Sequence, residues 1–253
     1  KTTASKTLVV SLRKEEDVMG IFHKGKKDDK PNPVSLITMF NKRSVISEQY
    51  RTIRSNIRFS MVDKDLKSLV ITSAGPKEGK STVANNLAVV FADAGLKTLL
   101  VDADLRKPTA DLTWALSRDE GLSNLLVDKT SNYENYVSKT KVEGLFVLTS
   151  GHVPPNPSEL LGTERMQEIL QTLTQNFDLV IFDTPPLTAV TDAQILASRT
   201  DGTILVVRER QRDKREIMLS KQLLDMAQAN ILGVVFNGTK ASRDDYYYYG
   251  SKS

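Results

Sequence analysis

The sequence predicts an α/β fold of the P-loop NTPase type, with a parallel sheet flanked by helices on both faces. From residue 44 onward, short apolar runs rich in β-branched residues alternate with amphipathic segments, as in strands joined by helical crossovers. The stretch AGPKEGKST, residues 74–82, follows one such run and opens a predicted helix, as a phosphate-binding loop does. The length of 253 residues suits one large domain with an extension.

The elements are predicted in chain order from periodicity and from residues that start or stop helices. A helix is expected over 47–59, because Ile46, Tyr50, Ile53 and Ile57 share one helical face. The predicted strands cover 68–72, 97–102, 145–148, 178–183, 203–207 and 231–236. The predicted helices cover 83–94, ended by Gly95, then 121–127, 132–139, 158–175, 192–198 and 214–229.

Composition divides the chain into three parts. Residues 1–43 are expected to form a flexible arm or activator-like segment, because they hold a charged run at 24–30 and two prolines. Its two apolar patches, 8–10 and 36–40, are candidates for docking on the domain. Residues 44–240 form the predicted P-loop domain, and 241–253 form a tyrosine-rich flexible tail.

Charge and cysteine content exclude several classes of function. The absence of cysteine excludes disulfides, thiolate zinc sites and cysteine nucleophiles. His23 and His152 are far apart, so a histidine metal site is not expected. A net charge of +4 is too small to indicate a nucleic-acid partner. No apolar run approaches the ~20 residues that span a bilayer, which predicts a cytoplasmic protein.

The glycine loop predicts a site for a nucleoside triphosphate, ATP, on the pattern G-x-x-x-x-G-K-[ST]. Ala74 replaces the first glycine. Backbone N–H groups at the helix start can cradle phosphate, Lys80 can reach the β- and γ-phosphates, and Ser81 can bind Mg²⁺. The predicted nucleotide-binding residues are Gly75, Pro76, Lys77, Glu78, Gly79, Lys80, Ser81 and Thr82.

Three aspartates stand at the ends of predicted strands. Asp102 and Asp104 follow one apolar run, and Asp183 ends another. Because the carboxyl ends of parallel strands form the ligand crevice, and a buried carboxylate is costly without a cation, these side chains predict a metal site beside the P-loop. Helix capping is the alternative interpretation, and it applies best to Asp104. The predicted Mg²⁺ ligands are Ser81, Asp104 and Asp183.

Together these motifs resemble those of the bacterial tyrosine kinases that control capsule and exopolysaccharide synthesis. Residues 75–82, 101–109 and 181–186 resemble the Walker A, A′ and B motifs of that family. Glu48, Arg51 and Arg54 resemble its ring-forming helix motif, residues 150–160 resemble its loop between the second and third motifs, and 244–250 resemble its tyrosine-rich tail. The resemblance covers residues 44–250.

The resemblance implies an ATP-dependent protein-tyrosine kinase, with 44–240 as its kinase domain. It implies Asp102 as the base, with Lys80 and Asp104 also catalytic, and supporting roles for Arg106 and Lys107. A tyrosine phenol has a pKa near ~10, so it needs a base at neutral pH. The implied phosphate acceptors are Tyr246, Tyr247, Tyr248 and Tyr249, modified between subunits.

The implied partners follow from the same resemblance. They are further copies of the chain in a ring that uses Glu48, Arg51 and Arg54, protein tyrosine substrates, and a transmembrane activator. This activator or adaptor would hold the kinase at the inner face of the cell membrane. Without the resemblance, the three helix residues read as an ordinary solvated face, and the tail reads as an aromatic end or a buried edge strand.

Two other functions remain open at this point. A partition or Min-type switch ATPase shares the aspartate motifs, but it carries an extra lysine where this chain has Gly75, and Lys77 lies two residues later. A nucleotide-binding scaffold of a polysaccharide complex is the second alternative, kept open by Ala74 and by the Lys77–Glu78 pair. The switch ATPase also leaves the four consecutive tyrosines unexplained.

Overall fold

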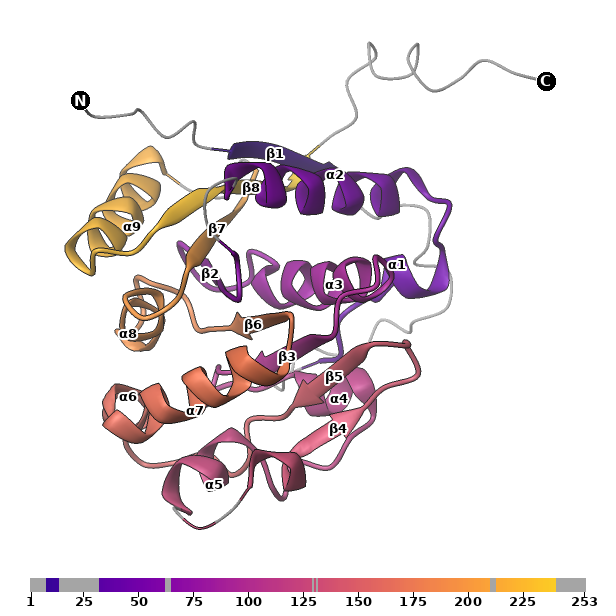
Figure 1. The fold of residues 1–253 in the computed structure, drawn as a ribbon. Coiled ribbons are helices and arrows are strands. Elements are labelled where there is room, and N and C mark those ends of the chain that lie inside the picture. The colour runs from indigo at the N-terminus through magenta and orange to yellow at the C-terminus, as the bar shows by residue number, and fades with distance from the viewer. Residues whose placement is uncertain are drawn as a thin grey trace, which may run out of the picture.

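The computed structural model describes residues 8–13, 32–61, 65–128, 130, 132–209 and 213–239. Within them lies one eight-stranded sheet in the order β1-β8-β7-β2-β6-β3-β5-β4 (Figure 1). All neighbouring strands pair in parallel except β4 and β5, which are antiparallel. The strands are β1 (Leu8–Arg13), β2 (Ser68–Ser73), β3 (Thr98–Asp102), β4 (Val137–Lys139), β5 (Leu145–Leu148), β6 (Leu179–Asp183), β7 (Gly202–Arg208) and β8 (Ile231–Thr239).

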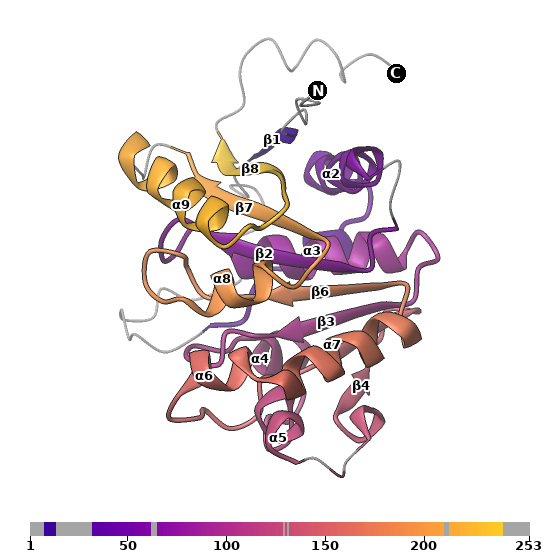
Figure 2. The same ribbon diagram turned by 60° about the vertical axis from the view of Figure 1, so that its left-hand side comes forward.

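Helices cover both faces of the sheet, which confirms the predicted fold class (Figure 2). One face is covered by α1 (Ile37–Phe40), α2 (Val45–Ser60), α3 (Lys80–Ala92) and α4 (Ala110–Trp114). The other face is covered by α5 (Leu122–Val127), α6 (Pro157–Gly162), α7 (Glu164–Asn176), α8 (Asp192–Ala197) and α9 (Lys214–Met226).

The central strands are buried on both sides, as their continuous apolar runs indicate. Every residue of β2, β3 and β6 is buried. Side chains alternate between the two faces: Leu69 and Ile71 enter the core beneath α3, whereas Val70 enters the core beneath the helices of the other face. Polar side chains at the ends of these strands therefore stand out from an apolar background.

Two of the predicted helices are wrong in part. Residues 132–139 form a short 3₁₀-helix, η1 (Tyr133–Asn135), followed by the edge strand β4. Tyr133, Tyr136 and Val137 pack on the core through this extended course, so tertiary contacts override the weak helical pattern.

The helix expected over 158–175 is divided into α6 and α7. Thr163 interrupts it, because its side chain accepts a hydrogen bond from the N–H of Met166 and starts a new helix. Arg199 donates to the carbonyl oxygens of Leu161, Gly162 and Thr163, which satisfies the end of α6.

Both apolar patches of the N-terminal arm lie against the domain. Residues 8–13 pair with β8, and α1 packs on α3. The N–H and hydroxyl of Thr38 donate to Oδ1 of the fully buried Asn86 at 3.0 and 2.8 Å, and Nδ2 of Asn86 donates to the carbonyl oxygen of Ser35. The domain bounds at 43 and 240 remain predictions. Across the described ranges, no helix has the length and apolarity to cross a membrane.

Candidate phosphate-transfer site

The predicted P-loop connects β2 to α3 in a tight turn. Gly79 precedes α3 with φ of +90°, and Lys77 also has a positive φ, of +64°. The left-handed backbone angle favours glycine, and a Cβ on Gly79 would lie 2.1 Å from Nδ2 of Asn237, so a larger residue would have to displace that amide. Ala74 is fully buried and its φ is not positive, which explains why alanine is tolerated where the pattern has glycine.

Neighbouring strand ends hold the loop in place. The hydroxyl of Thr188 donates to the carbonyl oxygen of Ala74 at 2.6 Å, and Nδ2 of Asn237 donates to that of Glu78 at 2.9 Å. Arg208 donates to the carbonyl oxygen of Lys77 at 3.2 Å. The buried carboxylate of Glu78 accepts from the N–H of Gly75 at 2.9 Å. The loop is thus largely preformed.

Lys80 lies among the strand-end carboxylates. Its Nζ is 2.9 Å from Oδ2 of Asp104, 3.4 Å from Oδ1 of Asp183 and 3.2 Å from Oγ of Ser81. Burial on its own would lower the pKa of Lys80, but attraction to Asp183 and Asp104 raises it above its ordinary value. Lys80 is therefore a fixed positive charge at the start of α3.

Asp102 is held by backbone donors. Its Oδ2 accepts from the N–H groups of Thr109 and Ala110, each at 2.9 Å, and its Oδ1 accepts from Asp104 N–H at 3.2 Å. Burial, followed by repulsion from Asp183, raises the pKa of Asp102 from 3.8 to about 7, although the backbone donors oppose this shift. Burial also raises the pKa of Asp183.

The donor set around Lys80 suits a hard cation. Ser81, Asp104 and Asp183 present hydroxyl and carboxylate oxygens, which are the ligands that Mg²⁺ prefers. No group of three or more acidic or histidine side chains forms a complete metal cage among the residues described above. Mg²⁺ at nucleotide sites usually has one or two carboxylates plus phosphates and waters, so the residues fit that kind of site.

Arg106 is directed by a buried partner that the sequence did not single out. It donates to both carboxylate oxygens of Asp192, at 3.0 and 3.1 Å, and to Oγ of Ser158 at 3.0 Å. Ser158 in turn donates to Asp192 at 2.6 Å. Asp192 is fully buried, and it joins the loop after β3 to the starts of α6 and α8. Lys107 donates its N–H to Asp104 at 3.0 Å.

The other predicted site residues that the structure describes lie on α2. On α2, Arg51 pairs with Glu48 and also donates to the carbonyl oxygen of Lys42 at 2.8 Å. Arg54 donates to the carbonyl oxygen of Val90 on α3 at 2.8 Å. Tyr246–Tyr249 lie outside the described residues.

The fold and this site define a P-loop nucleotide-binding protein with acidic side chains at the adjoining strand ends. A family model described as "AAA domain" matches residues 67–213. The chain is 48% identical over 219 residues to the tyrosine-protein kinase YwqD of Bacillus subtilis, covering 86% of this chain and 92% of that one. It is 43% identical over 210 residues to the putative tyrosine-protein kinase CapB of Staphylococcus aureus, covering 82% and 92%.

Solved structures agree with these relatives. The kinase domain of the Escherichia coli tyrosine kinase ETK matches with a TM-score of 0.83 and 32% identity, covering 96% of this chain and 94% of that one. The chimerical protein CapA2B2 matches with 0.78 and 43%, covering 83% and 94%. The chain belongs to the bacterial tyrosine-protein kinase family. It is a protein-tyrosine kinase, as the motifs predicted.

Proposed function

We propose that this kinase phosphorylates its own C-terminal tyrosine cluster between subunits and thereby regulates capsule and exopolysaccharide synthesis and export. The observation that supports it most directly is the convergence of Lys80, Asp104 and Asp183 within 3.4 Å beside the P-loop, with Asp102 on the adjoining strand. Four consecutive tyrosines, at 246–249, supply acceptors in the same chain.

The chain's own residues have distinct tasks in this transfer. Backbone N–H groups of residues 75–82 bind the phosphates, and Lys80 neutralises their charge. Asp102 accepts the phenol proton while the phenol oxygen bonds to the γ-phosphorus and the bond to the departing ADP breaks. Its raised pKa makes Asp102 a stronger base than an ordinary carboxylate.

Ser81, Asp104 and Asp183 would hold Mg²⁺, which when bound supplies charge neutralisation on the phosphates. Lys80 lies between these two carboxylates now, and its amine can turn to the phosphates when they arrive. Arg106 lies on the loop after β3, two residues beyond Asp104. Its side chain is held by Asp192 and adds positive charge to this loop.

A direct experiment tests the kinase step and its residues. The protein is incubated with Mg-ATP and probed for phosphotyrosine, beside Lys80→Met and Asp102→Asn. We expect labelling of the tail in the wild type and its loss in both variants, with Lys214→Met as a control for the loss of one cation. ATP hydrolysis without labelling would support a switch ATPase, and neither activity would support a scaffold.

The position of β8 leaves two routes open for phosphorylating the tail: within one subunit and between subunits. Strand β8 runs parallel to β7 and β2, so it ends at the same edge of the sheet as the P-loop, two strands away. Chain length alone therefore permits either route. A Lys80→Met subunit with an intact tail is mixed with an active subunit in which Tyr246–Tyr249 are phenylalanine; phosphate on the inactive subunit is the expected result.

The proposed assembly is a ring in which Glu48, Arg51 and Arg54 pair across subunits. All three side chains are engaged within the subunit here, so the ring requires Arg51 to exchange its partner Glu48 for one on a neighbour. Tail phosphorylation adds about −1.5 to −2 charges per site and would loosen the ring. Identical size-exclusion profiles, with Mg-ATP, for wild type and the Tyr246–Tyr249→Phe variant would contradict this.

We also propose that a transmembrane adaptor holds the kinase at the inner face of the membrane. Solved relatives include a chimerical protein, CapA2B2, whose 43% identity to this chain covers most of both. Residues 8–13 and 36–40 are the candidate contact region, because they already lie against β8 and α3.

The switch-ATPase alternative shares only part of the evidence. The cell-division ATPase MinD of Pyrococcus furiosus matches with a TM-score of 0.57 and 27% identity, covering 68% of this chain and 71% of that one. Switch ATPases carry a lysine at the position that Gly75 occupies in this chain. The N–H of Gly75 donates to the carboxylate of Glu78. We therefore retain the kinase interpretation.

A further inference from the structure

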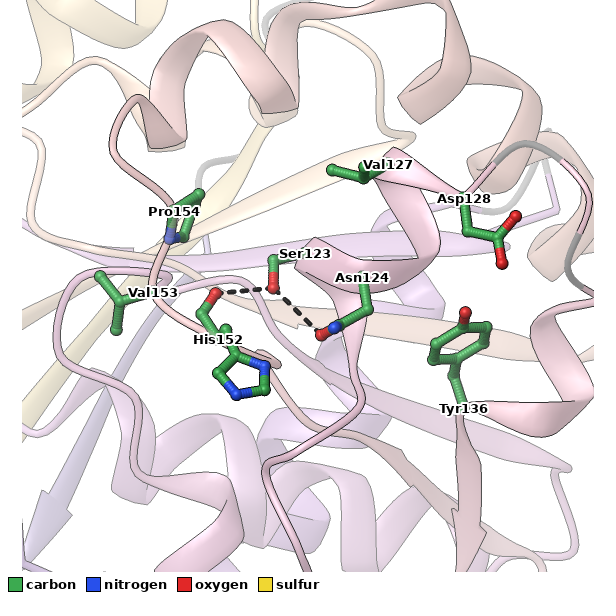
Figure 3. Close-up of a pocket in the computed structure, with 8 residues that line it drawn as sticks. All are labelled: Ser123, Asn124, Val127, Asp128, Tyr136, His152, Val153 and Pro154. Atoms are coloured by element: carbon green, nitrogen blue, oxygen red, sulfur yellow. Dashed lines mark hydrogen bonds between the residues drawn. The ribbon is translucent and has the colours of Figure 1, made fainter.

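A cavity separate from the phosphate site lies at the same edge of the sheet. Its volume is about 400 Å³, and it forms where α5 packs on the loop after β5 (Figure 3). The N–H of Ser123 donates to the carbonyl oxygen of Ser150 at 2.9 Å, and its hydroxyl donates to that of His152 at 2.7 Å. These bonds join the helix to the loop and give the cavity a fixed floor.

Strand register places the start of the loop that leads to this cavity beside Asp102. Asp102 pairs with Asp183 across β3 and β6, and Val101 pairs with Leu148 across β3 and β5. Thr149, which directly follows Leu148, is therefore in register with Asp102. Adjacent strands are about 4.8 Å apart. The order from the P-loop outward is therefore Asp183, Asp102 and then the loop that lines the cavity.

The lining suits an aromatic ring with a polar tip. Val153 and Pro154 face Tyr136 and Asp128 across the cavity, and Val127 lies at its rim (Figure 3). Val127 and Val153 are 70% and 55% exposed, so together they offer apolar surface to a ligand in the cavity. A tyrosine side chain combines an apolar ring with one hydroxyl, and Asp128 and Asn124 can hydrogen-bond to that hydroxyl.

We propose that this cavity is a subsite for a second, unmodified tyrosine of the substrate, occupied while a neighbouring tyrosine of the same tail is at the phosphate site. The inference rests on the proposed function, and the occupant is the segment 244–250 of a second copy. In an extended peptide, tyrosines two or three places apart are separated by about 7–10 Å. This corresponds to about two strand spacings, the step from β3 across β5 to β4, which Tyr136 directly precedes.

The same lining rejects phosphotyrosine. A phosphorylated side chain carries about −1.5 to −2 charges and would meet the carboxylate of Asp128. Among the described residues that line the cavity, none is lysine or arginine. An unmodified tyrosine therefore anchors the tail, and the anchor is lost once only one unmodified tyrosine remains for the phosphate site. The subsite makes repeated phosphorylation of one tail self-limiting.

The test uses the full chain with Tyr246–Tyr249→Ala, so that only added peptide is phosphorylated and the enzyme's own tail does not fill the subsite. Three peptides of sequence 241–253 are compared: the natural one, one with Tyr247–Tyr249 replaced by alanine, and one with them replaced by phenylalanine. The subsite predicts that KM for the alanine peptide is about five-fold higher than for the phenylalanine peptide, whose rings still fill the cavity, at similar kcat. KM for the natural peptide is expected to be the lowest of the three, because only tyrosine also offers the hydroxyl. In the double variant Val127→Ser, Val153→Ser this preference disappears, while KM for ATP is unchanged.

Met226→Ser is the matched control, because Met226 is 80% exposed on α9, away from the cavity. An unchanged preference in the valine double variant would overturn the subsite and leave another occupant for the cavity. Failure of the wild type to phosphorylate any peptide would instead overturn the proposed function. Asp128→Asn adds a second readout: inhibition by a fully phosphorylated tail peptide becomes stronger if Asp128 repels phosphate, and unchanged inhibition contradicts that role.

Discussion

Asp102 and Asp183 are paired at the ends of the neighbouring strands β3 and β6, and burial raises the pKa of both carboxyl groups. Each also feels the negative charge of Asp104, while Lys80 supplies a positive charge beside Asp104 and Asp183. Without metal and nucleotide, this cluster is therefore short of positive charge. Several measurable properties of the metal-free protein follow from that shortage.

The stability of the metal-free kinase should fall as pH rises from 5 to 8. The folded-state pKa of Asp102, about 7, is above its ordinary 3.8, so folding favours the protonated form. Its contribution is full below pH 3.8 and is lost as pH rises through 7. Urea unfolding with EDTA should therefore show a steeper decline for wild type than for Asp102→Asn. The exposed Glu143→Gln serves as control, and parallel wild-type and Asp102→Asn curves would contradict the expectation.

Replacing Lys80 by methionine should cost stability as well as activity. It removes the ammonium group that contacts Asp104 and Asp183, leaving buried carboxylates without a cation. Breaking such a pair costs about 3–5 kcal/mol. We expect a loss of this order at pH 8 and a smaller one at lower pH, because burial raises the pKa of Asp183 and its protonation removes part of the unpaired charge. The exposed Lys214→Met should change the unfolding free energy little at either pH.

Gly79→Ala should distort the P-loop for two separable reasons. The left-handed backbone costs a non-glycine residue about 1–2 kcal/mol, and the new methyl group would meet the amide of Asn237. Adding Asn237→Ala should relieve the clash and leave the backbone cost. A double-mutant cycle on thermal midpoint and ATP affinity measures the two parts. Strict additivity of the two substitutions would show that the clash is absent.

Asp192→Asn should slow phosphorylation through Arg106. An asparagine side chain presents one acceptor where Arg106 and Ser158 now use both carboxylate oxygens, so a buried bond is lost at a cost of about 1–3 kcal/mol. We expect a lower kcat and a nearly unchanged KM for the peptide. Ser158→Ala removes two hydrogen bonds, one to Arg106 and one to Asp192, but keeps the Arg106–Asp192 pair, so its effect on kcat should be smaller. Equal decreases of kcat in Asp192→Asn and Ser158→Ala would contradict the expectation that Asp192 contributes more than Ser158 to holding Arg106.

Trp114 should report nucleotide binding by its fluorescence. It is the only tryptophan, its Nε1 donates to Asn85 Oδ1 at 2.6 Å, and Asn85 Nδ2 donates to the carbonyl oxygen of Ser81 at 2.8 Å. A change at the first turn of α3 therefore reaches the indole through one side chain. Emission should shift on titration with Mg-ADP, and Asn85→Ala should reduce the shift. A full response in Asn85→Ala would exclude this route.

Much of the fold was predictable because its signals are local. The apolar runs of β2, β3 and β6, and the glycine loop between strand and helix, are visible in consecutive residues. The errors have a different origin. The course of 132–139 is set by contacts with the core and by pairing with β5, and the break at Thr163 is completed by Arg199, which lies far away in sequence.

The site shows the same division. Asp104 and Asp183 were predicted from strand ends, and Lys80 from the P-loop pattern, to share one site, and the structure places both carboxylates in contact with Lys80. Asn237 and Asp192 were missed. Asn237 lies beyond the predicted end of its strand, and a polar residue at that strand end was the available signal. Asp192 was interpreted only as a helix start; its contact with Arg106 spans 86 residues.

The buried hydrogen bonds between Thr38 and Asn86 connect the N-terminal segment to the helix that begins at the P-loop. Asn86 belongs to α3 and donates both to Ser35 in that segment and to the carbonyl oxygen of Thr82 at the P-loop end. A partner that displaces residues 35–38 must break bonds to this amide and so perturb the helix on which phosphate rests. Thermodynamic reciprocity then requires nucleotide to change the affinity for that partner by the same factor. Through Asn86, binding of the partner would thus change the affinity for ATP, and binding of ATP would change the affinity for the partner.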